Sequence, residues 1–546
     1  MDDKHDDRRR TPEDDLAAGL SKRGLAFQLA AVVLVGLSLS ATGFLMFRWL
    51  RPSAQLSSGG TPSERPRAKL FRTWPADRKP DVVLMLTGQQ QGYLQPCGCS
   101  RPQLGGLERR YNFVQEVLRK QGWPVVAADL GDIAQHSSPQ ALIKYRYSME
   151  ALKVLGYTGI SVGKNEVDLG LLDVLAEYAL NNPVPRVLDA NLANKAQNFP
   201  NMVESWKTAG GENGVPKVAF VGATAHILAN QAAAGGQGLA FEPLDKSLKT
   251  ALDEVAKESP DLSVLLLAGE LREAEKCAEQ FPQFPVIVYA TAEEEPPQMP
   301  SRKGKSLLIG LGHKGRYVGL VGAFRQPNGA FQLHYQLAAM EEAYETAKGK
   351  DADNPILDLL QRYATEVKEK NFLAQYPKTQ HPLQLAFDSK YVGSARCESC
   401  HPTAYKIWEQ TPHSHAYQTL ADAKRPSLRQ FDGECIVCHV TGFQYKTGFS
   451  DAKATQHLED NGCENCHGPG SAHLKDRHNP KILALMNPYK TQPNETPEQS
   501  KTRMTRLNDS CQKCHDVDND VNWNIKKWSK IIHMTPPEEK KKQQEK

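Results

Sequence analysis

Short apolar runs alternate with amphipathic stretches between residues 80 and 336, and this alternation predicts an α/β domain. The amphipathic stretches Leu107–Lys120 and Ala141–Leu155 are expected to be helices. A domain of this length can bury a substantial core without a cofactor. The apolar runs that we expect to form buried strands are Val82–Leu86, Val125–Asp129, Gly159–Val162, Val218–Val221, Leu262–Leu267, Val286–Tyr289 and Ser306–Ile309.

A longer apolar run, Gly24–Phe47, contains 24 consecutive uncharged residues. At about 1.5 Å per helical residue it is long enough to cross a bilayer core of about 30 Å. Lys22 and Arg23 precede it, which favours a cytoplasmic N-terminus for residues 1–23. A cleaved signal peptide is the alternative, but no Ala-x-Ala site follows the run. We therefore expect a single-pass inner-membrane anchor at 24–47, with most of the chain on the exported, periplasmic side.

The remaining segments differ in composition. Residues 48–79 are rich in Pro, Ser and Gly and are expected to be a linker, whereas 337–386 are predicted to be a helical connector. Residues 387–533 have few strand signals and many Gly, Pro and Asn, so a mainly α, loop-rich domain is expected there. Residues 534–546 are expected to be a disordered tail. The formal charge of +4 is small for 546 residues, so no nucleic-acid partner is expected.

One motif, Cys-x-x-Cys-His, occurs four times between residues 397 and 515. Two thiols at this spacing can form thioethers to the two vinyl groups of one haem, and the adjacent His can ligate the iron. Zinc knuckles also use Cys-x-x-Cys pairs, but they do not require His directly after the second Cys. We therefore expect four covalently bound c-type haems. Their attachment residues would be Cys397, Cys400, Cys435, Cys438, Cys463, Cys466, Cys511 and Cys514, and the proximal ligands His401, His439, His467 and His515.

Histidine is abundant beside these motifs. Six further His follow Phe387, whereas the same stretch has only three Met. This supply favours bis-His iron over Met/His iron, and thus low to moderate potentials. The six are His413, His415, His457, His473, His478 and His533.

The runs Tyr391–Leu420, Cys435–Phe449 and Gly462–His473 resemble the c-554 type of tetrahaem cytochrome. That family is the electron acceptor associated with hydroxylamine oxidation, so the resemblance implies electron transfer with redox partner proteins or a quinol system. It also implies three distal ligands: His413, His473 (with His478 as the alternative) and His533. It would leave the haem of His439 five-coordinate, unless His415 or His457 closes that site.

The α/β domain resembles the calcineurin-like metallophosphatases of the 5′-nucleotidase type, on pieces such as Leu84–Tyr93, Asp129–Asp132 and Gly156–Gly170. Those enzymes use two metals, held by Asp, His and Asn, to activate water against phosphate. Here Gln89 and Gln91 replace the Asp-x-His motif, and Lys164 with Asn165 and Glu166 replaces Asn-His-Glu. Asp132 is retained, but one carboxylate cannot hold two metals. The resemblance therefore implies a sandwich fold without catalysis. Cys97 and Cys99 lie near this loop, and we expect them to be two buried thiols.

The hypothesis that follows is a multidomain protein: a transmembrane helix, a metallophosphatase-like domain and a multihaem domain that transfers electrons. It has no expected catalytic residue. Two alternatives remain. The His439 haem could act on a small nitrogen compound, or the chain could be a phosphoesterase fused to a cytochrome.

Overall fold

The computed structural model describes residues 70–96, 102–235, 238–516, 518–520 and 522–530. The expected anchor, Cys97, Cys99, His533 and the expected tail lie outside these ranges. Within the described ranges, no helix is both long enough and apolar enough to cross a membrane.

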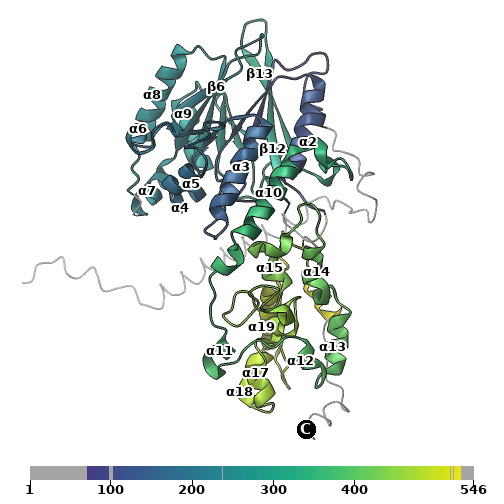
Figure 1. Cartoon of the computed structure of the whole chain (residues 1–546). Coiled ribbons are helices and arrows are strands. Elements are labelled where there is room, and N and C mark those ends of the chain that lie inside the picture. Colours follow the sequence, from purple (N-terminus) through teal and green to yellow (C-terminus); the bar gives the residue numbers. More distant parts are fainter. Residues whose placement is uncertain (1–69, 97–101, 236–237, 517, 521, 531–546) are drawn as a thin grey trace, which may run out of the picture. The chain divides into compact units, whose positions relative to one another are not determined.

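Two mixed β-sheets form the centre of the α/β domain (Figure 1). Both sheets have parallel central strands; the six-stranded sheet is antiparallel at both edges, and the seven-stranded sheet at one. The seven-stranded sheet has the order β13 (Phe331–Ala339), β12 (Tyr317–Arg325), β1 (Val82–Thr87), β2 (Val125–Asp129), β3 (Tyr157–Ser161), β4 (Arg186–Leu188) and β5 (Val203–Glu204). The six-stranded sheet has the order β10 (Ser301–Lys303), β11 (Ser306–Gly310), β9 (Val286–Tyr289), β8 (Leu262–Ala268), β7 (Val218–Thr224) and β6 (Trp206–Ala209).

Both faces of strand β1 are buried, which explains why the apolar runs in the sequence are continuous. Val82 and Leu84 belong to the core between the sheets, whereas Val83 and Met85 face the core under the helices. In the second sheet, Val264 of β8 faces the first sheet and Leu265 faces α8 (Leu244–Lys257) and α9 (Leu271–Gln280). Both faces of each central strand are therefore buried, as is typical of parallel sheets covered by helices.

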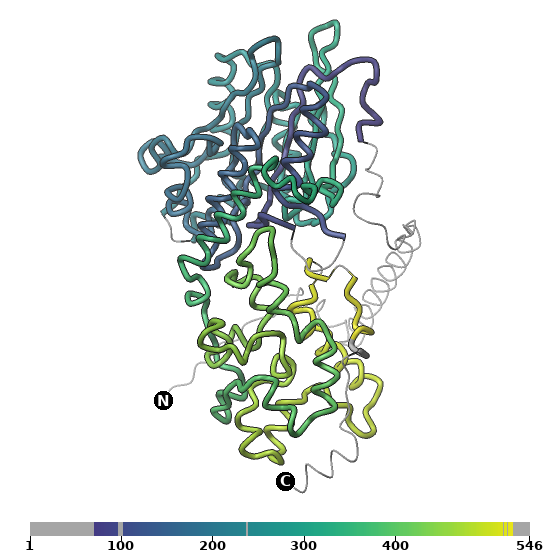
Figure 2. The backbone as a smooth tube through the Cα atoms, turned by 45° about the vertical axis from the view of Figure 1, so that its right-hand side comes forward, coloured from purple at the N-terminus to yellow at the C-terminus, as the bar shows by residue number. Residues whose placement is uncertain are grey.

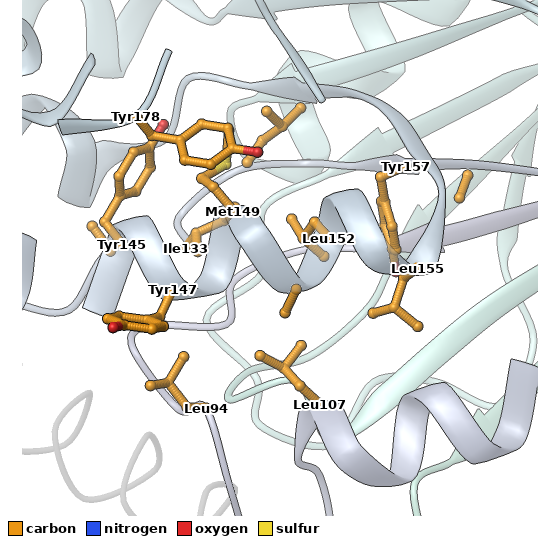
Figure 3. Close-up of a cluster of buried hydrophobic side chains, with 14 of the residues drawn as sticks. Leu94, Leu107, Ile133, Tyr145, Tyr147, Met149, Leu152, Leu155, Tyr157 and Tyr178 are labelled. Atoms are coloured by element: carbon orange, nitrogen blue, oxygen red, sulfur yellow. The ribbon is translucent and has the colours of Figure 1, made fainter. Parts of the chain in front are cut away.

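Helix α3 (Ala141–Leu155) covers the first sheet (Figure 3). Tyr145, Met149 and Leu152 recur at helical spacing and are buried in one cluster. The helix ends at Gly156, whose φ of 86° is the left-handed conformation that glycine adopts most easily.

The expected elements agree with the structure except at a few places. All seven expected strands are present, although β3 begins two residues earlier than expected. The stretch 107–120 is helical but not one α-helix: α2 (Leu107–Phe113) continues into a π-helical turn, Val114–Leu118, and a 3-10 turn, Arg119–Gln121. The expected boundary at 336 falls inside β13, so the α/β domain extends at least to Ala339.

The expected connector is largely part of the α/β domain. Its main helix, α10 (Pro355–Glu369), begins at Asn354, whose side chain accepts a hydrogen bond from Ile356 N–H at 3.0 Å. Tyr363 of α10 packs edge-on against Tyr147 of α3, with ring centroids 5.7 Å apart. Ile356, Leu359, Leu360 and Tyr363 all lie in the core under the first sheet. The predicted helix is thus present, and it packs on the α/β domain.

The segment after residue 380 consists of short helices and loops (Figure 2). Its larger apolar cluster has only eight buried members, among them Tyr391, Ile436 and Phe449. Its helices include α11 (Pro382–Phe387), α12 (Ala395–Glu398), α13 (Pro402–Glu409), α14 (Ala416–Ala421), α15 (Gly433–His439), α16 (Cys463–His467), α17 (Ser471–Lys475), α18 (Pro480–Met486) and α19 (Pro497–Cys511). Such a small apolar core is less than a segment of this length normally buries, so bound haem would have to supply much of the interior here.

Candidate haem-binding site

Each Cys-x-x-Cys-His motif lies on a helical turn. The second and third motifs form the helices α15 and α16, and the fourth begins at the last residue of α19. In the first and fourth motifs the His N–H donates to the carbonyl of the first Cys, at 2.8 Å and 2.9 Å. Residues three and four apart share one side of a helical turn, so both thiols and the imidazole can face one haem.

Three of the four proximal histidines are oriented through Nδ1. Nδ1 of His439 lies 2.6 Å from the carbonyl oxygen of Ala416, and Nδ1 of His467 lies 2.8 Å from that of Met486. Because a carbonyl oxygen only accepts, each Nδ1 must carry the hydrogen. Nε2 then keeps its lone pair for a metal, which is the arrangement found in metal-bound histidines.

Nδ1 of His515 has a carboxylate acceptor instead. It lies 3.1 Å from Oδ2 of Asp520, which also accepts from Lys527 Nζ at 2.9 Å. The ring of Trp523 stacks on His515 with centroids 4.6 Å apart. The fourth proximal His is therefore held by a charged partner and a ring, and a carboxylate partner raises the basicity of an imidazole ligand.

Two pairs of histidine rings lie close together, one pair nearly parallel and the other edge-to-face, at a separation that would fit one iron. The centroids of His401 and His473 are 6.2 Å apart, and those of His413 and His515 are 5.9 Å apart. Two metal–nitrogen bonds of about 2 Å, plus about 1 Å from each nitrogen to its ring centre, give about 6 Å. His473 thus lies beside His401 of the first motif, and His413 lies beside His515 of the fourth.

Burial keeps these imidazoles neutral. It lowers the pKa of His413, His439 and His473, and neighbouring histidines lower the pKa of His413 and His473 further. Only a neutral imidazole has a lone pair free for iron, so the surroundings favour the form that binds the metal. The third expected distal ligand, His533, lies outside the described residues.

Thiols of different motifs meet in two pairs. The thiols of Cys397 and Cys463 hydrogen-bond each other, which raises the pKa of Cys397 and lowers that of Cys463 to about 7. A hydrogen bond from Cys438 likewise lowers the pKa of Cys514. The first motif thus adjoins the third, and the second adjoins the fourth.

Glu464, between the two cysteines of the third motif, is a site residue that sequence reasoning missed. Its buried carboxylate accepts from the backbone N–H groups of Val392, at 3.0 Å, and of Gly393 and Gly470, at 2.7 Å. Burial raises its pKa, although these bonds oppose the shift. Val392 and Gly393 lie five and four residues before Cys397, so Glu464 joins the third motif to the segment that leads into the first. An acidic residue between the two cysteines of a motif gave no signal of this role.

In the α/β domain, the residues at the positions that resemble phosphatase metal ligands bind backbone groups instead. Gln89 donates to the carbonyl of Thr291 at 3.0 Å and accepts from its N–H at 2.9 Å. Glu166 accepts from the N–H groups of Ala134 and Gly163, at 2.7 and 2.9 Å, and burial with the nearby Asp132 raises its pKa to about 7. These side chains therefore hold the backbone of the loops through hydrogen bonds, and they do not fit a dinuclear metal centre.

The other replaced positions follow the same pattern. Asn165 donates to the carbonyl of Ala134 at 2.8 Å, and its N–H donates to Asp132 at 2.7 Å. Lys164 is paired with Asp168 on the exposed side of its helix. The positions that resemble the metallophosphatase ligands thus stabilise the backbone of the former metal loops.

Comparison with known proteins supports the identity of the C-terminal segment. Residues 396–468 match the family described as cytochrome c554 and c-prime. Cytochrome c-554 of Nitrosomonas europaea is 33% identical over 97 residues, which is 16% of this chain and 41% of that protein. The chain thus spans about two fifths of this relative. The resemblance of this segment to c-554-type cytochromes is confirmed, and the segment is of the c-type, haem-bearing kind.

Solved structures similar to the N-terminal part are 5′-nucleotidases and related enzymes. SoxB of Thermus thermophilus is 14% identical with a TM-score of 0.45, covering 55% of this chain and 62% of that one. A 5′-nucleotidase precursor of the same organism is 18% identical with a TM-score of 0.44, covering 55% and 60%. The NAD nucleotidase of Haemophilus influenzae is 14% identical with a TM-score of 0.43, covering 60% and 68%.

Proposed function

We propose that this protein is a membrane-anchored, exported tetrahaem c-type cytochrome that transfers electrons between redox partner proteins or from a quinol system. The observation that carries the proposal is the set of oriented histidines: three proximal rings fixed through Nδ1 and two ring pairs spaced for one iron each. When bound, c-type haem supplies one-electron redox chemistry.

The chain's own residues favour electron transfer over ligand turnover at the first and fourth motifs. His473 and His413 lie beside His401 and His515, so with haem bound they could ligate the same iron and would then exclude water and substrates from it. Rigid ligands on both faces also limit structural change between oxidation states. The contacts between thiols of neighbouring motifs favour short distances between the attached groups.

The apolar run Gly24–Phe47 supports the anchoring. The Cys-x-x-Cys-His motifs support the exported location, because c-type haem is attached on the exported side of bacterial-type membranes. The same run and the basic residues Lys22 and Arg23 support a cytoplasmic N-terminus.

The mass of the purified protein and its resonance spectrum test the proposal. Four haems should add to the mass of the polypeptide, and Cys-to-Ala changes in one motif should remove one of them. Electron paramagnetic resonance of the oxidised protein should show at least two low-spin ferric centres, and a chemically reduced sample should pass electrons to a soluble cytochrome. A protein with haem that neither accepts nor donates electrons would contradict the transfer role.

The same spectrum separates the alternatives. A high-spin signal that nitric oxide or cyanide shifts would favour chemistry at the haem of His439. Hydrolysis of a nucleotide with added manganese or zinc would favour a phosphoesterase, against the side-chain partners found at Gln89, Asn165 and Glu166.

A further inference from the structure

A carboxylate of the haem segment is held by the loops of the α/β domain. Asp518, three residues after the fourth motif, pairs with Lys314 at 2.6 Å and with Arg316, and accepts from Tyr93 Oη at 3.2 Å. The Asp518 side chain is only 9% exposed. Glu294 completes the network, at 2.6 Å from Lys314 and 3.0 Å from Arg316. Two cations thus balance two carboxylates, of which Asp518 is nearly buried and Glu294 is 38% exposed.

This basic pair adjoins the loop in which the resemblance places the phosphatase metals. The Lys314 N–H donates to the carbonyl of Gln89 at 2.8 Å, and the neighbouring His313 contacts the carbonyl of Thr291, to which Gln89 also binds. At the place where the resembling enzymes act on anionic phosphate, this chain thus has a carboxylate of its own, that of Asp518.

A second carboxylate is held at the second motif. Lys144 of α3, with 8% of its side chain exposed, pairs with Glu434 directly before Cys435. Gln140 donates to Asp432 at 3.1 Å and accepts from the N–H of Gly433 at 3.2 Å. Asp432 itself caps α15, because it accepts from Glu434 N–H at 2.9 Å. The start of the second haem helix is thus fixed by side chains of the α/β domain.

We infer that the α/β domain is retained as a receptor for these two carboxylates, and that Lys144, Lys314 and Arg316 are positioning residues for the second and fourth haems. The two motifs also adjoin each other through Cys438 and Cys514. The inference rests on the proposed function only in requiring that haem is attached to these motifs.

The test uses the full-length, haem-loaded protein with Asp518→Asn, and separately with Lys314→Met combined with Arg316→Gln. The second variant leaves the haem segment unchanged, so it keeps the test valid if the first fails to mature. The matched control is Glu495→Gln. Glu495 has a side chain that is also 9% exposed and pairs with Arg503 at 2.8 Å, within the haem segment alone.

Hydrogen exchange of the loops 88–96 and 312–318 should become roughly tenfold faster or more in both test variants, as expected when a buried pair is broken, and stay unchanged in Glu495→Gln. In a potentiometric titration, the midpoint of the fourth haem should move in both test variants. The component that loses its low-spin signal in His413→Ala identifies that haem. Exchange and midpoints equal to those of Glu495→Gln would overturn the inference. Exchange does not depend on electron transfer, so failure of the proposed function would leave this result readable.

Discussion

Single residues around the motifs determine how the iron ligands are held. The acceptors at Nδ1 differ: backbone carbonyls for His439 and His467, a carboxylate for His515. A sequence does not show which backbone carbonyl a histidine will contact. Only Asp520, five residues after His515, could have been predicted as a partner of Nδ1. By contrast, the motif cysteines and the proximal histidines were visible as residue types at a spacing, and His413 and His473 were indicated by the resemblance to c-554-type cytochromes.

Replacing His473 should open one iron. In His473→Ala, one low-spin ferric signal should be lost and one high-spin signal gained, because the ring facing His401 is removed. The measurement is electron paramagnetic resonance of the oxidised protein. His478→Ala is the control, since His478 is exposed and lies five residues further along. The pairing would be wrong if His478→Ala, and not His473→Ala, changed the spin state.

Replacing Asp520 should change the potential of one haem. In Asp520→Asn the carboxylate beside His515 Nδ1 becomes a neutral amide, so the imidazole is a weaker donor and the ferric state loses stabilisation. The midpoint of that haem should rise in a spectroelectrochemical titration. Asp509→Asn, at an exposed position of α19, should leave all midpoints unchanged. A lowered or unaltered midpoint in Asp520→Asn would contradict the role of this carboxylate.

At the scale of elements, the apolar runs predicted the parallel strands correctly, because both faces of those strands are buried. The hairpin of β12 and β13 was missed, although Phe331, Leu333, Tyr335 and Leu337 alternate with polar residues and a Pro-Asn-Gly turn precedes them. Strand β13 is only partly buried, so it lacks a continuous apolar run, and in β12 two glycines interrupt the apolar run. The docking of α10 on α3 could not be predicted, since an amphipathic helix does not reveal which surface it covers.

Acid should weaken the attachment of α10 to α3. Partial burial alone would raise the pKa of Glu366, but hydrogen bonds from Arg146 and Lys370 outweigh it and lower the pKa to about 2. A lowered folded-state pKa stabilises the protein above the unfolded value of 4.5, and this contribution disappears as the pH falls from about 4.5 towards 2.

Glu366→Gln should therefore lower the free energy of unfolding near pH 7 by about 1 kcal/mol, a typical value for a partly exposed pair. The difference from the unmodified protein should shrink below pH 4.5 in denaturant titrations followed by circular dichroism. Glu369→Gln, on the exposed side of α10, should show no such difference. A loss that persisted unchanged at pH 3 would contradict the assignment.

At the scale of the whole molecule, the two parts of the chain draw their stability from different sources. The α/β domain has three large apolar clusters, whereas the segment after residue 380 has two small ones. The sequence indicated this contrast through its strand signals and its motifs. It did not indicate which motifs adjoin the α/β domain, because that depends on polar contacts between residues far apart in the chain.

Removing the haem attachment should unfold only one part. With all eight motif cysteines changed to Ala, the α/β domain should keep its circular dichroism, because its clusters contain no haem contacts. The segment after residue 380 should become sensitive to trypsin. Limited proteolysis with mass measurement should then yield a stable fragment that includes residues 70–369. A haem-free chain that resisted trypsin throughout would show that the segment has a sufficient core of its own.

The histidine pairs have a consequence for the order of assembly. His401 and His473 are about 70 residues apart and His413 and His515 about 100, so an iron bound by either pair would close a long loop, whose entropic cost grows only slowly with length. A chain emerging from its N-terminal end exposes His401 well before His473, and His413 well before His515. In the proposed cytochrome, a haem on the first motif would therefore gain His473 only later, and the loop between His413 and His515 would close only when the last motif has been made.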